Sequence, residues 1–371
     1  MAKHNATNAR IKREYFTYLK EAQRRDDTSI DPVAKALARF EEANGHKDFK
    51  SFHKQQAVAF KRKLDNQLAV RTGKPLSRAT VHSTLSALRA FFVWLAGQPG
   101  YKSRLSYADA DYFNLAEKDV RIAKAVRTKP FPSLDQIHHV LATMPTGTAI
   151  ELRNRALIAF ALLTGARDGA LASFKLKHVD LAQSRVDQDA REVRTKGSKT
   201  FTTWFFPVGG EALAIFQDWC HYLRTALLWG DDDPLFPPTQ VGIGAGGGFV
   251  AVGLRRDGWH GAGPIREIFR GAFEAAALPY FNPHSFRDTL VQLGEQICPT
   301  IEVFKAWSQN LGHERVMTTL TSYGTVAPHR QAELIRGMAA GKAHGATTLT
   351  VEQIAALTAI LAQQAGTAPL S

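Results

Sequence analysis

The sequence contains few cysteines and no long apolar run. Its two cysteines, Cys220 and Cys298, stand far apart and outside any C-x-x-C pair, which argues against a disulfide framework and a cysteine zinc site. The longest apolar stretch, ALIAFALLTG at 156–165, is far shorter than the roughly 18 residues that a membrane-spanning helix needs. The N-terminal MAKHNATNARIKREYF lacks the apolar core of a secretory signal. We therefore expect a cytoplasmic protein with no membrane segment.

Acidic residues are scarce in the first third of the chain. The net charge is +13, and it is unevenly distributed. Residues 1–130 hold 26 lysines and arginines against 13 acidic residues, whereas residues 131–371 hold 21 of each kind. This split predicts a basic region that binds a polyanion, followed by a neutral region that acts on it. The alternative is a basic surface that serves only solubility.

The first third is typical of a small bundle of helices. Apolar residues recur at three- and four-residue spacing over 8–25, 31–45, 51–70 and 78–97. The side chains that these apolar stripes leave available to phosphate groups are Lys61, Arg62, Lys63, Arg78, His82 and Arg89. Residues 98–130 lack a clear period, and the basic residues and two prolines of RIAKAVRTKPFPS predict an extended linker.

The remainder of the chain predicts helices around a small sheet. Helices are expected after Ser133 and at 151–165, 210–227, 264–277, 284–296, 299–310 and 326–339. Short β-prone runs on either side of TKGSK predict an antiparallel sheet with a hairpin at 184–206. GIGAGGG at 242–248 contains G-x-G-x-x-G, but no strand clearly precedes it and no helix follows, so we expect a flexible surface loop. The fold class is therefore mainly α with a small antiparallel β-sheet.

Four separated segments supply residues suited to phosphodiester transfer without a metal ion. They are Arg167 in LLTGARDGAL, Lys196 in TKGSK, His284 with Arg287 in NPHSFRD, and His313 with Tyr323 in LGHERVMTTLTSYG. Arginines can bind the nonbridging oxygens, a lysine can protonate a leaving alkoxide, and histidines can hold phosphate or move protons. A tyrosine can attack and store the bond energy as an ester, so no cofactor is implied. Taken alone, Tyr323 can equally be a core aromatic.

At these residues the chain resembles the tyrosine recombinases, the phage integrase family, from about residue 50 to residue 340. The resemblance is strongest in the segments LLTGAR, NPHSFR and LGHERVMTTLTSY. The segment RATVHSTLSALRAFFVWL is similar to the family's core-binding domain. The resemblance implies a helical core-binding (SAM-like) bundle at 1–125 and an α+β catalytic domain at 126–340. It also implies that the six residues above form the active site, with Tyr323 as the nucleophile. The expected function is site-specific strand exchange on double-stranded DNA, by four protomers on two sites.

The active-site lysine can be assigned in more than one way. The family's lysine is usually the first of its K-G-x-K turn, which favours Lys196 over Lys199, and over Lys175 and Lys177 upstream.

Two positions depart from the family's pattern. The acidic residue usually found three positions after the first arginine is replaced by Ala170, and the nearest carboxylate is Asp168. The interval from His313 to Tyr323 is ten residues, one more than usual, and one residue turns a helical side chain by about 100°. A local loop or bulge must therefore restore the direction in which the tyrosine side chain points. A type IB topoisomerase and a catalytically silent DNA-binding regulator remain alternatives.

The tail combines a connector with an apolar stripe. TLTVEQIAALTAILAQQAG at 348–366 follows a glycine-bearing connector, and its apolar residues recur at helical spacing. We expect 341–371 to form a connector and an amphipathic helix. This helix would pack on its own catalytic domain or, as the resemblance implies, on a neighbouring protomer.

Overall fold

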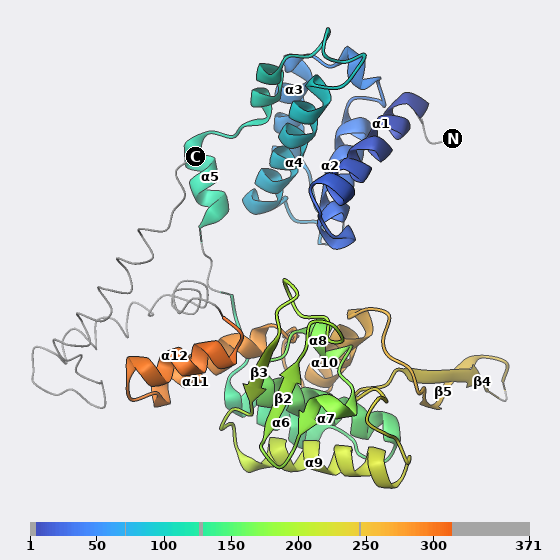
Figure 1. Ribbon diagram of the computed structural model, residues 1–371, viewed down its shortest axis with the longest axis vertical. Coiled ribbons are helices and arrows are strands. Elements are labelled where there is room, and N and C mark those ends of the chain that lie inside the picture. Colours follow the sequence, from blue (N-terminus) through green and yellow to red (C-terminus); the bar gives the residue numbers. More distant parts are fainter. Residues whose placement is uncertain (1–4, 71, 126–128, 245, 314–371) are drawn as a thin grey trace, which may run out of the picture. The chain divides into compact units, whose positions relative to one another are not determined.

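The protein divides into two compact units, Met1–Ala125 and Val126–Ser371, in the computed structural model (Figure 1). The structure describes residues 5–70, 72–125, 129–244 and 246–313. Tyr323, the predicted helix at 326–339 and the predicted tail helix within 341–371 lie outside the described residues. Among the helices described, none is both long and apolar enough to cross a membrane.

The first unit is a helical bundle built on an aromatic core. Its main helices are α1 (Ala6–Thr17), which continues as a π-helical turn η1 (Tyr18–Ala22), α2 (Asp27–Ala43), α3 (Lys54–Asn66) and α4 (Arg78–Ala96). The ring of Phe40 on α2 meets Phe60 and Phe92 edge-on, at centroid distances of 5.3 and 5.5 Å. Because these rings bury the apolar stripes of three helices together, the polar faces of α3 and α4 are turned to solvent.

The stretch without a clear period, 98–120, contains helical elements, and the linker predicted at 121–133 begins within a helix. The elements are a 3₁₀ helix, η3 (Tyr107–Phe113), and a short helix, α5 (Glu117–Lys124). Ala110 and Phe113 are both buried, and the Phe113 ring stacks on Phe92 at 5.2 Å. A 3₁₀ helix brings residues three apart onto one side, a period that a search for α-helical spacing does not detect.

The second unit packs helices around one helix whose C-terminal half is fully buried. The helices are α6 (Leu134–Thr143), α7 (Ala149–Thr164), α8 (Asp168–Leu171), α9 (Gly210–Thr225), α10 (Gly263–Ala275), α11 (Ser285–Ile297) and α12 (Ile301–Asn310). Every residue from 156 to 164 of α7 is buried, so this helix is the centre of the core. Phe160 of α7 packs on Phe216 of α9, with ring centroids 4.6 Å apart.

A three-stranded antiparallel sheet lies beside these helices. It is formed by β1 (Val179–Asp180), β2 (Arg185–Gln188) and β3 (Phe201–Trp204), in that spatial order, with Val186 opposite Thr203. The β2–β3 connection is the hairpin predicted around TKGSK. The prediction of a mainly helical fold with a small antiparallel sheet is confirmed.

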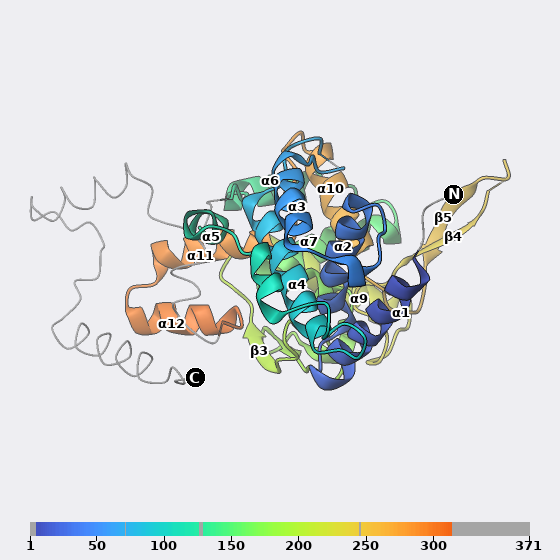
Figure 2. The same cartoon turned by 90° about the horizontal axis from the view of Figure 1, so that it is seen from above.

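A strand precedes the glycine-rich run and another follows it, so the expectation that no strand precedes the run is wrong. The run lies at the end of a second hairpin, β4 (Thr239–Ile243) and β5 (Phe249–Leu254), which projects from the rest of its unit in both views (Figures 1 and 2). Val241, Ile243 and Phe249 on it are exposed. The glycines interrupt the alternation of apolar residues, which is the pattern that would have predicted these strands.

Candidate active site

Arg167 stands at a tight turn between α7 and α8. Gly165 ends α7 in the left-handed conformation, with φ of 59°, and Arg167 is the N-cap residue of α8. A Cβ atom at Gly165 would lie 2.7 Å from Leu311 Cδ2 and 3.0 Å from Leu290 Cδ1. Glycine is therefore required both by the backbone conformation and by the close approach of these two side chains. The turn places the half-buried Arg167 next to the segments that hold the other candidate residues.

Arg287 joins three of the predicted motifs. It lies on α11, only 2% exposed, and donates to Gly165 O at 2.7 Å and to Leu311 O at 2.5 Å. Its Nη2 also lies 2.7 Å from His313 Nε2. One guanidinium thus bonds to the turn before Arg167 and to the Leu-Gly-His segment after α12. These bonds hold the motifs together although they are far apart in the sequence.

The contact between Arg287 and His313 fixes the protonation of the histidine. A guanidinium has only donors, so His313 Nε2 must accept, and a neutral ring then carries its proton on Nδ1. Desolvation, followed by the positive charges of Arg287 and Arg167, lowers the pKa of His313 to about 3. His313 is therefore neutral near pH 7.

His284 experiences the same positive field. It is the N-cap residue of α11 and is exposed at the surface. Desolvation of the imidazole, followed by the positive charges of Arg287 and Arg167, nevertheless lowers the pKa of His284 to about 4. Lys129 and Lys196 contribute further positive charge. His284 is therefore also neutral near pH 7.

Lys196 projects from the turn of the β2–β3 hairpin. The turn has two successive residues with positive φ, Gly197 at 71° and Ser198 at 51°, which reverse the chain within four residues. Lys196 is exposed, and its charge acts on His284, whereas the charge of the half-buried Lys199 acts on His313. Both lysines thus belong to the electrostatic surroundings of the site.

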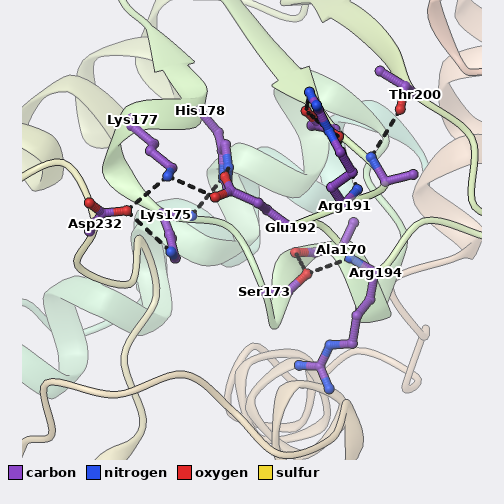
Figure 3. A network of polar contacts seen from close by, with 12 residues as sticks. Ala170, Ser173, Lys175, Lys177, His178, Arg191, Glu192, Arg194, Thr200 and Asp232 are labelled. Atoms are coloured by element: carbon purple, nitrogen blue, oxygen red, sulfur yellow. Dashed lines mark hydrogen bonds and ion pairs between the residues drawn. The ribbon is translucent and has the colours of Figure 1, made fainter.

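Lys175 and Lys177, the alternatives upstream, are engaged in an ion-pair network (Figure 3). Lys177 Nζ lies 2.8 Å from Glu192 Oε1 and 2.8 Å from Asp232 Oδ1, and Lys175 Nζ lies 3.2 Å from the same Asp232 atom. Hydrogen bonds to Asp232 and then to Glu192 raise the pKa of Lys177 well above its usual value. A lysine that holds its proton so strongly is poorly suited to protonate a leaving group, so the geometry favours the hairpin lysines.

The position of the family's usual carboxylate is occupied by a buried methyl group. Ala170 is 1% exposed, within the core. The nearby carboxylate of Asp168 accepts from Arg266 Nε of α10 at 2.7 Å and from the Gly169 backbone N–H at 2.9 Å. Asp168 therefore links α8 to α10 through Arg266.

Two charged residues of the site were not predicted from the sequence. Lys129 adds positive charge at His284, and desolvation raises the pKa of Asp288 to about 6, opposed by the charges of Lys129 and Arg287. The segment after Lys129 is fixed on α11 by a 2.5 Å hydrogen bond from Thr289 Oγ1 to Pro132 O. The signals were a lysine directly before the prolines of the connector and an aspartate directly after the H-x-x-R motif.

The basic residues predicted to contact DNA lie on α3 and α4, and several are paired with other groups. Arg78 lies 2.5 Å from Asp65 Oδ1, Arg89 lies 2.8 Å from Asp111 Oδ1, and Lys61 donates to Asn114 O at 3.0 Å. The other members of the predicted set are Arg62 and Lys63, which are exposed, and His82, which is half-buried. These surface ion pairs are weak in water, so a phosphate could displace the carboxylates at little cost.

The structure brings together five of the six predicted catalytic residues. Arg167, Lys196, His284, Arg287 and His313 come from four segments, and their charges act on the two histidines. The sixth, Tyr323, lies outside the described residues, as does the interval that separates it from His313. Among the residues described, no group of three or more histidine, cysteine, aspartate or glutamate side chains is placed to hold a metal ion.

Replacing Gly312 with alanine is expected to disturb the site through His313. Gly312 has φ of 71°, and a Cβ atom there would lie 2.6 Å from Phe201 Cζ on β3. The left-handed backbone alone costs an alanine about 1–2 kcal/mol, and the overlap with the ring adds to this. Denaturant unfolding should therefore show a lower free energy of unfolding, together with slower DNA cleavage. Gly258→Ala, where a Cβ meets nothing within 4 Å, is the matched control; equal stability of the two variants would contradict this account.

The chain is similar to known recombinases in sequence and in fold. No family model matches it. Tyrosine recombinase XerC of Lactobacillus delbrueckii subsp. bulgaricus is 25% identical over 255 residues, which span 67% of this chain and 72% of that protein. Tyrosine recombinase XerC of Escherichia coli O127:H6 is 30% identical over 164 residues, 44% of this chain and 48% of that protein.

Solved recombinase structures share the fold. A lambda integrase dimer bound to a COC′ core site has a TM-score of 0.56 at 12% identity, over 84% of this chain and 94% of that one. The XerH recombinase bound to palindromic difH substrate has a TM-score of 0.56 at 17% identity, over 89% of this chain and 84% of that one. The sequence relatives, the shared fold and the constellation of arginines and histidines together support the tyrosine recombinase, or phage integrase, family for this chain.

Proposed function

We propose that this recombinase cleaves and rejoins DNA through a 3′-phosphotyrosyl intermediate formed on Tyr323. As a tyrosine recombinase it is a DNA-binding, strand-transferring enzyme of site-specific recombination. The observation that supports the chemistry is the convergence of Arg167 and Arg287 on the two neutral histidines, His284 and His313, with Lys196 beside His284. Positive charge collected in this way suits a site for a phosphate anion.

The bonds change as follows in the proposed reaction. The Tyr323 hydroxyl oxygen attacks phosphorus, the bond from phosphorus to the 5′-oxygen breaks, and Lys196 gives its proton to that oxygen. Arg167 and Arg287 stabilise the charge on the nonbridging oxygens. The 5′-hydroxyl of a second strand then attacks the phosphorus, the bond from phosphorus to the Tyr323 oxygen breaks, and that oxygen takes up the proton that the hydroxyl loses. One phosphodiester replaces another, so no external energy source is needed.

The two histidines have a supporting role in this scheme. His284 and His313 are neutral in the absence of DNA, because desolvation and the neighbouring cations disfavour a further positive charge. His313 can donate its Nδ1 proton to a phosphate oxygen, since its Nε2 already accepts from Arg287. The neutral ring of His284 can either donate one hydrogen bond to a phosphate oxygen or accept the proton that the tyrosine loses. A bound phosphate anion would raise both pKa values, which assists the second role.

Covalent trapping on a nicked suicide substrate tests this function. A nick near the cleavage site lets the short strand diffuse away, so rejoining fails and the phosphotyrosyl adduct accumulates. We expect an adduct on denaturing gels that is sensitive to protease. A catalytically silent DNA-binding regulator would bind the substrate without forming the adduct. A type IB topoisomerase would form it but would also relax a plasmid without a target site, which a recombinase of defined sites should not do.

We further propose a role for each region and an assembly. Met1–Ala125 binds the DNA, the catalytic domain extends to about residue 340, and 341–371 contributes to contacts between protomers. Four protomers acting on two DNA sites would exchange the strands. The enzyme would act on DNA in the cytoplasm, at the nucleoid.

The fragment 1–125 is expected to bind DNA by itself, because it forms a compact unit with its own aromatic core and holds most of the chain's excess of basic residues. Its affinity should fall steeply with salt, with a log–log slope of about −0.9 for each neutralised phosphate. Fluorescence anisotropy across a salt series measures this slope. Lys63→Gln should make the slope shallower, whereas Arg10→Gln, which removes an exposed arginine ion-paired with Glu14, should not. A fragment that fails to bind DNA at low salt would show that the basic excess serves only solubility.

A further inference from the structure

The turn that carries Lys196 is short and closed on itself. Thr195 Oγ1 donates to Lys199 O at 2.7 Å, and the Ser198 backbone N–H donates to Thr195 O at 3.3 Å. These two hydrogen bonds restrict the internal conformation of the turn. The position of the Lys196 ammonium therefore depends on the contacts that fix the residues just before the turn.

Arg194, two residues before Lys196, is held by four hydrogen bonds to other segments. Its backbone N–H donates to Ser173 Oγ at 2.9 Å, and its guanidinium donates to Ala172 O at 3.1 Å. The same guanidinium donates to Trp259 O at 2.6 Å and to His260 O at 2.9 Å. Figure 3 shows Arg194 next to Ser173 and Ala170, at the end of α8. The planar guanidinium of an arginine has several N–H donors and can bind three carbonyls that lie in different directions. A single lysine ammonium cannot reach all three at once.

These bonds connect the Lys196 turn to the helix that begins at Arg167. Ser173 Oγ, which accepts from Arg194, lies 3.1 Å from Gly169 O and 3.2 Å from Ala170 O, both on α8. A Cβ atom on Gly169 would be 3.2 Å from Arg194 O, so the two backbones approach closely because that residue is glycine. α8 starts directly after its N-cap residue, Arg167. The position of Lys196 is thus set relative to Arg167 through Arg194.

We propose that Arg194 is a positioning residue, which holds the general acid Lys196 at the distance from Arg167 that protonation of the leaving 5′-oxygen requires. The inference rests on the function proposed above for Lys196. Arg194 acts only through Lys196 and touches no reacting atom. Its effect should therefore disappear when the leaving group needs no acid.

A pair of substrates separates this role from a purely structural one. A DNA strand with a bridging 5′-phosphorothiolate has sulfur in place of the leaving oxygen, and a thiolate leaves without protonation. Arg194→Ala should cleave ordinary DNA about 10²-fold more slowly, the loss expected for a misplacement of about 1 Å. It should cleave the phosphorothiolate DNA at nearly the rate of the unaltered protein. Arg194→Ala combined with Lys196→Ala should be no slower than Lys196→Ala alone.

Two further variants serve as controls. Arg191→Ala removes an arginine of the same segment that is 87% exposed and paired with Asp189, and it should cleave both substrates normally. Arg194→Lys keeps the charge but cannot reach all three carbonyls, so it should retain the defect on ordinary DNA. It also carries the test if Arg194→Ala does not fold, as judged by thermal unfolding.

The outcomes distinguish this inference from the function on which it rests. If phosphorothiolate DNA rescues Lys196→Ala but neither Arg194 variant, Arg194 has a structural role and the inference is overturned. If Lys196→Ala itself is not rescued, the acid has been misassigned and both proposals fall. Rescue of all of these variants supports both.

Discussion

Tyr323→Phe is expected to bind DNA with unchanged affinity and to form no covalent adduct on a nicked suicide substrate. The change removes a single oxygen, the proposed nucleophile, and retains the aromatic ring. Because cleavage proceeds only through that oxygen in the proposed mechanism, the loss should be complete to the detection limit, and not a reduction in rate. Binding is measured by gel shift and the adduct by denaturing gel electrophoresis.

Tyr280→Phe is the matched control. Tyr280 precedes α11, and its ring lies 4.3 Å from the Arg270 guanidinium. Removing its hydroxyl should leave adduct formation intact, since its proposed role is packing. An ester formed by Tyr323→Phe would refute the assignment, and loss of the ester in Tyr280→Phe would point to Tyr280 in its place.

Lys196→Ala is expected to cleave ordinary DNA about 10²–10⁴-fold more slowly, the usual contribution of a general acid. Lys196 is exposed at the hairpin turn, so its removal should not change the free energy of unfolding appreciably. DNA with a bridging 5′-phosphorothiolate should restore most of the rate. Single-turnover cleavage of the two substrates gives the ratio directly.

Lys199→Ala serves as the comparison for this result. Lys199 lies three residues away and is half-buried, and its charge acts on His313. Its loss should weaken the binding of the phosphate on both substrates alike. If the phosphorothiolate rescues Lys199→Ala and not Lys196→Ala, the second lysine of the turn is the acid.

Local signals predicted most of the helices. The start of α6 after Ser133 and the end of α7 at Gly165 followed from a capping serine and a glycine, because those signals depend on the neighbouring backbone alone. The hairpin around TKGSK was predicted for the same reason. The strands β4 and β5 were missed because glycines interrupt their alternation, and η3 was missed because its apolar period is three.

The geometry of the site was only partly predictable. The sequence motifs named Arg287 and His313, but not the hydrogen bond between them or the bond from Arg287 to Gly165 O. Such contacts depend on how α7, α11 and the segment after α12 pack, which no local pattern records. The anchoring of Arg194 on Trp259 O and His260 O is another example, since those carbonyls are about 65 residues away in sequence.

The convergence of cations at the site also has a thermodynamic consequence. In the absence of DNA, Arg167 and Arg287 repel a further positive charge on both imidazoles, and Lys196 repels one on His284, so the two histidines do not accept protons. That repulsion opposes folding of the catalytic unit, and an anion in the site relieves it. By linkage, an anion that binds this site only in the native state stabilises that state, by an amount that grows with the logarithm of its concentration relative to its Kd. The scissile phosphate would then act as a missing structural element of the enzyme, and the protein would be most rigid while its substrate is bound.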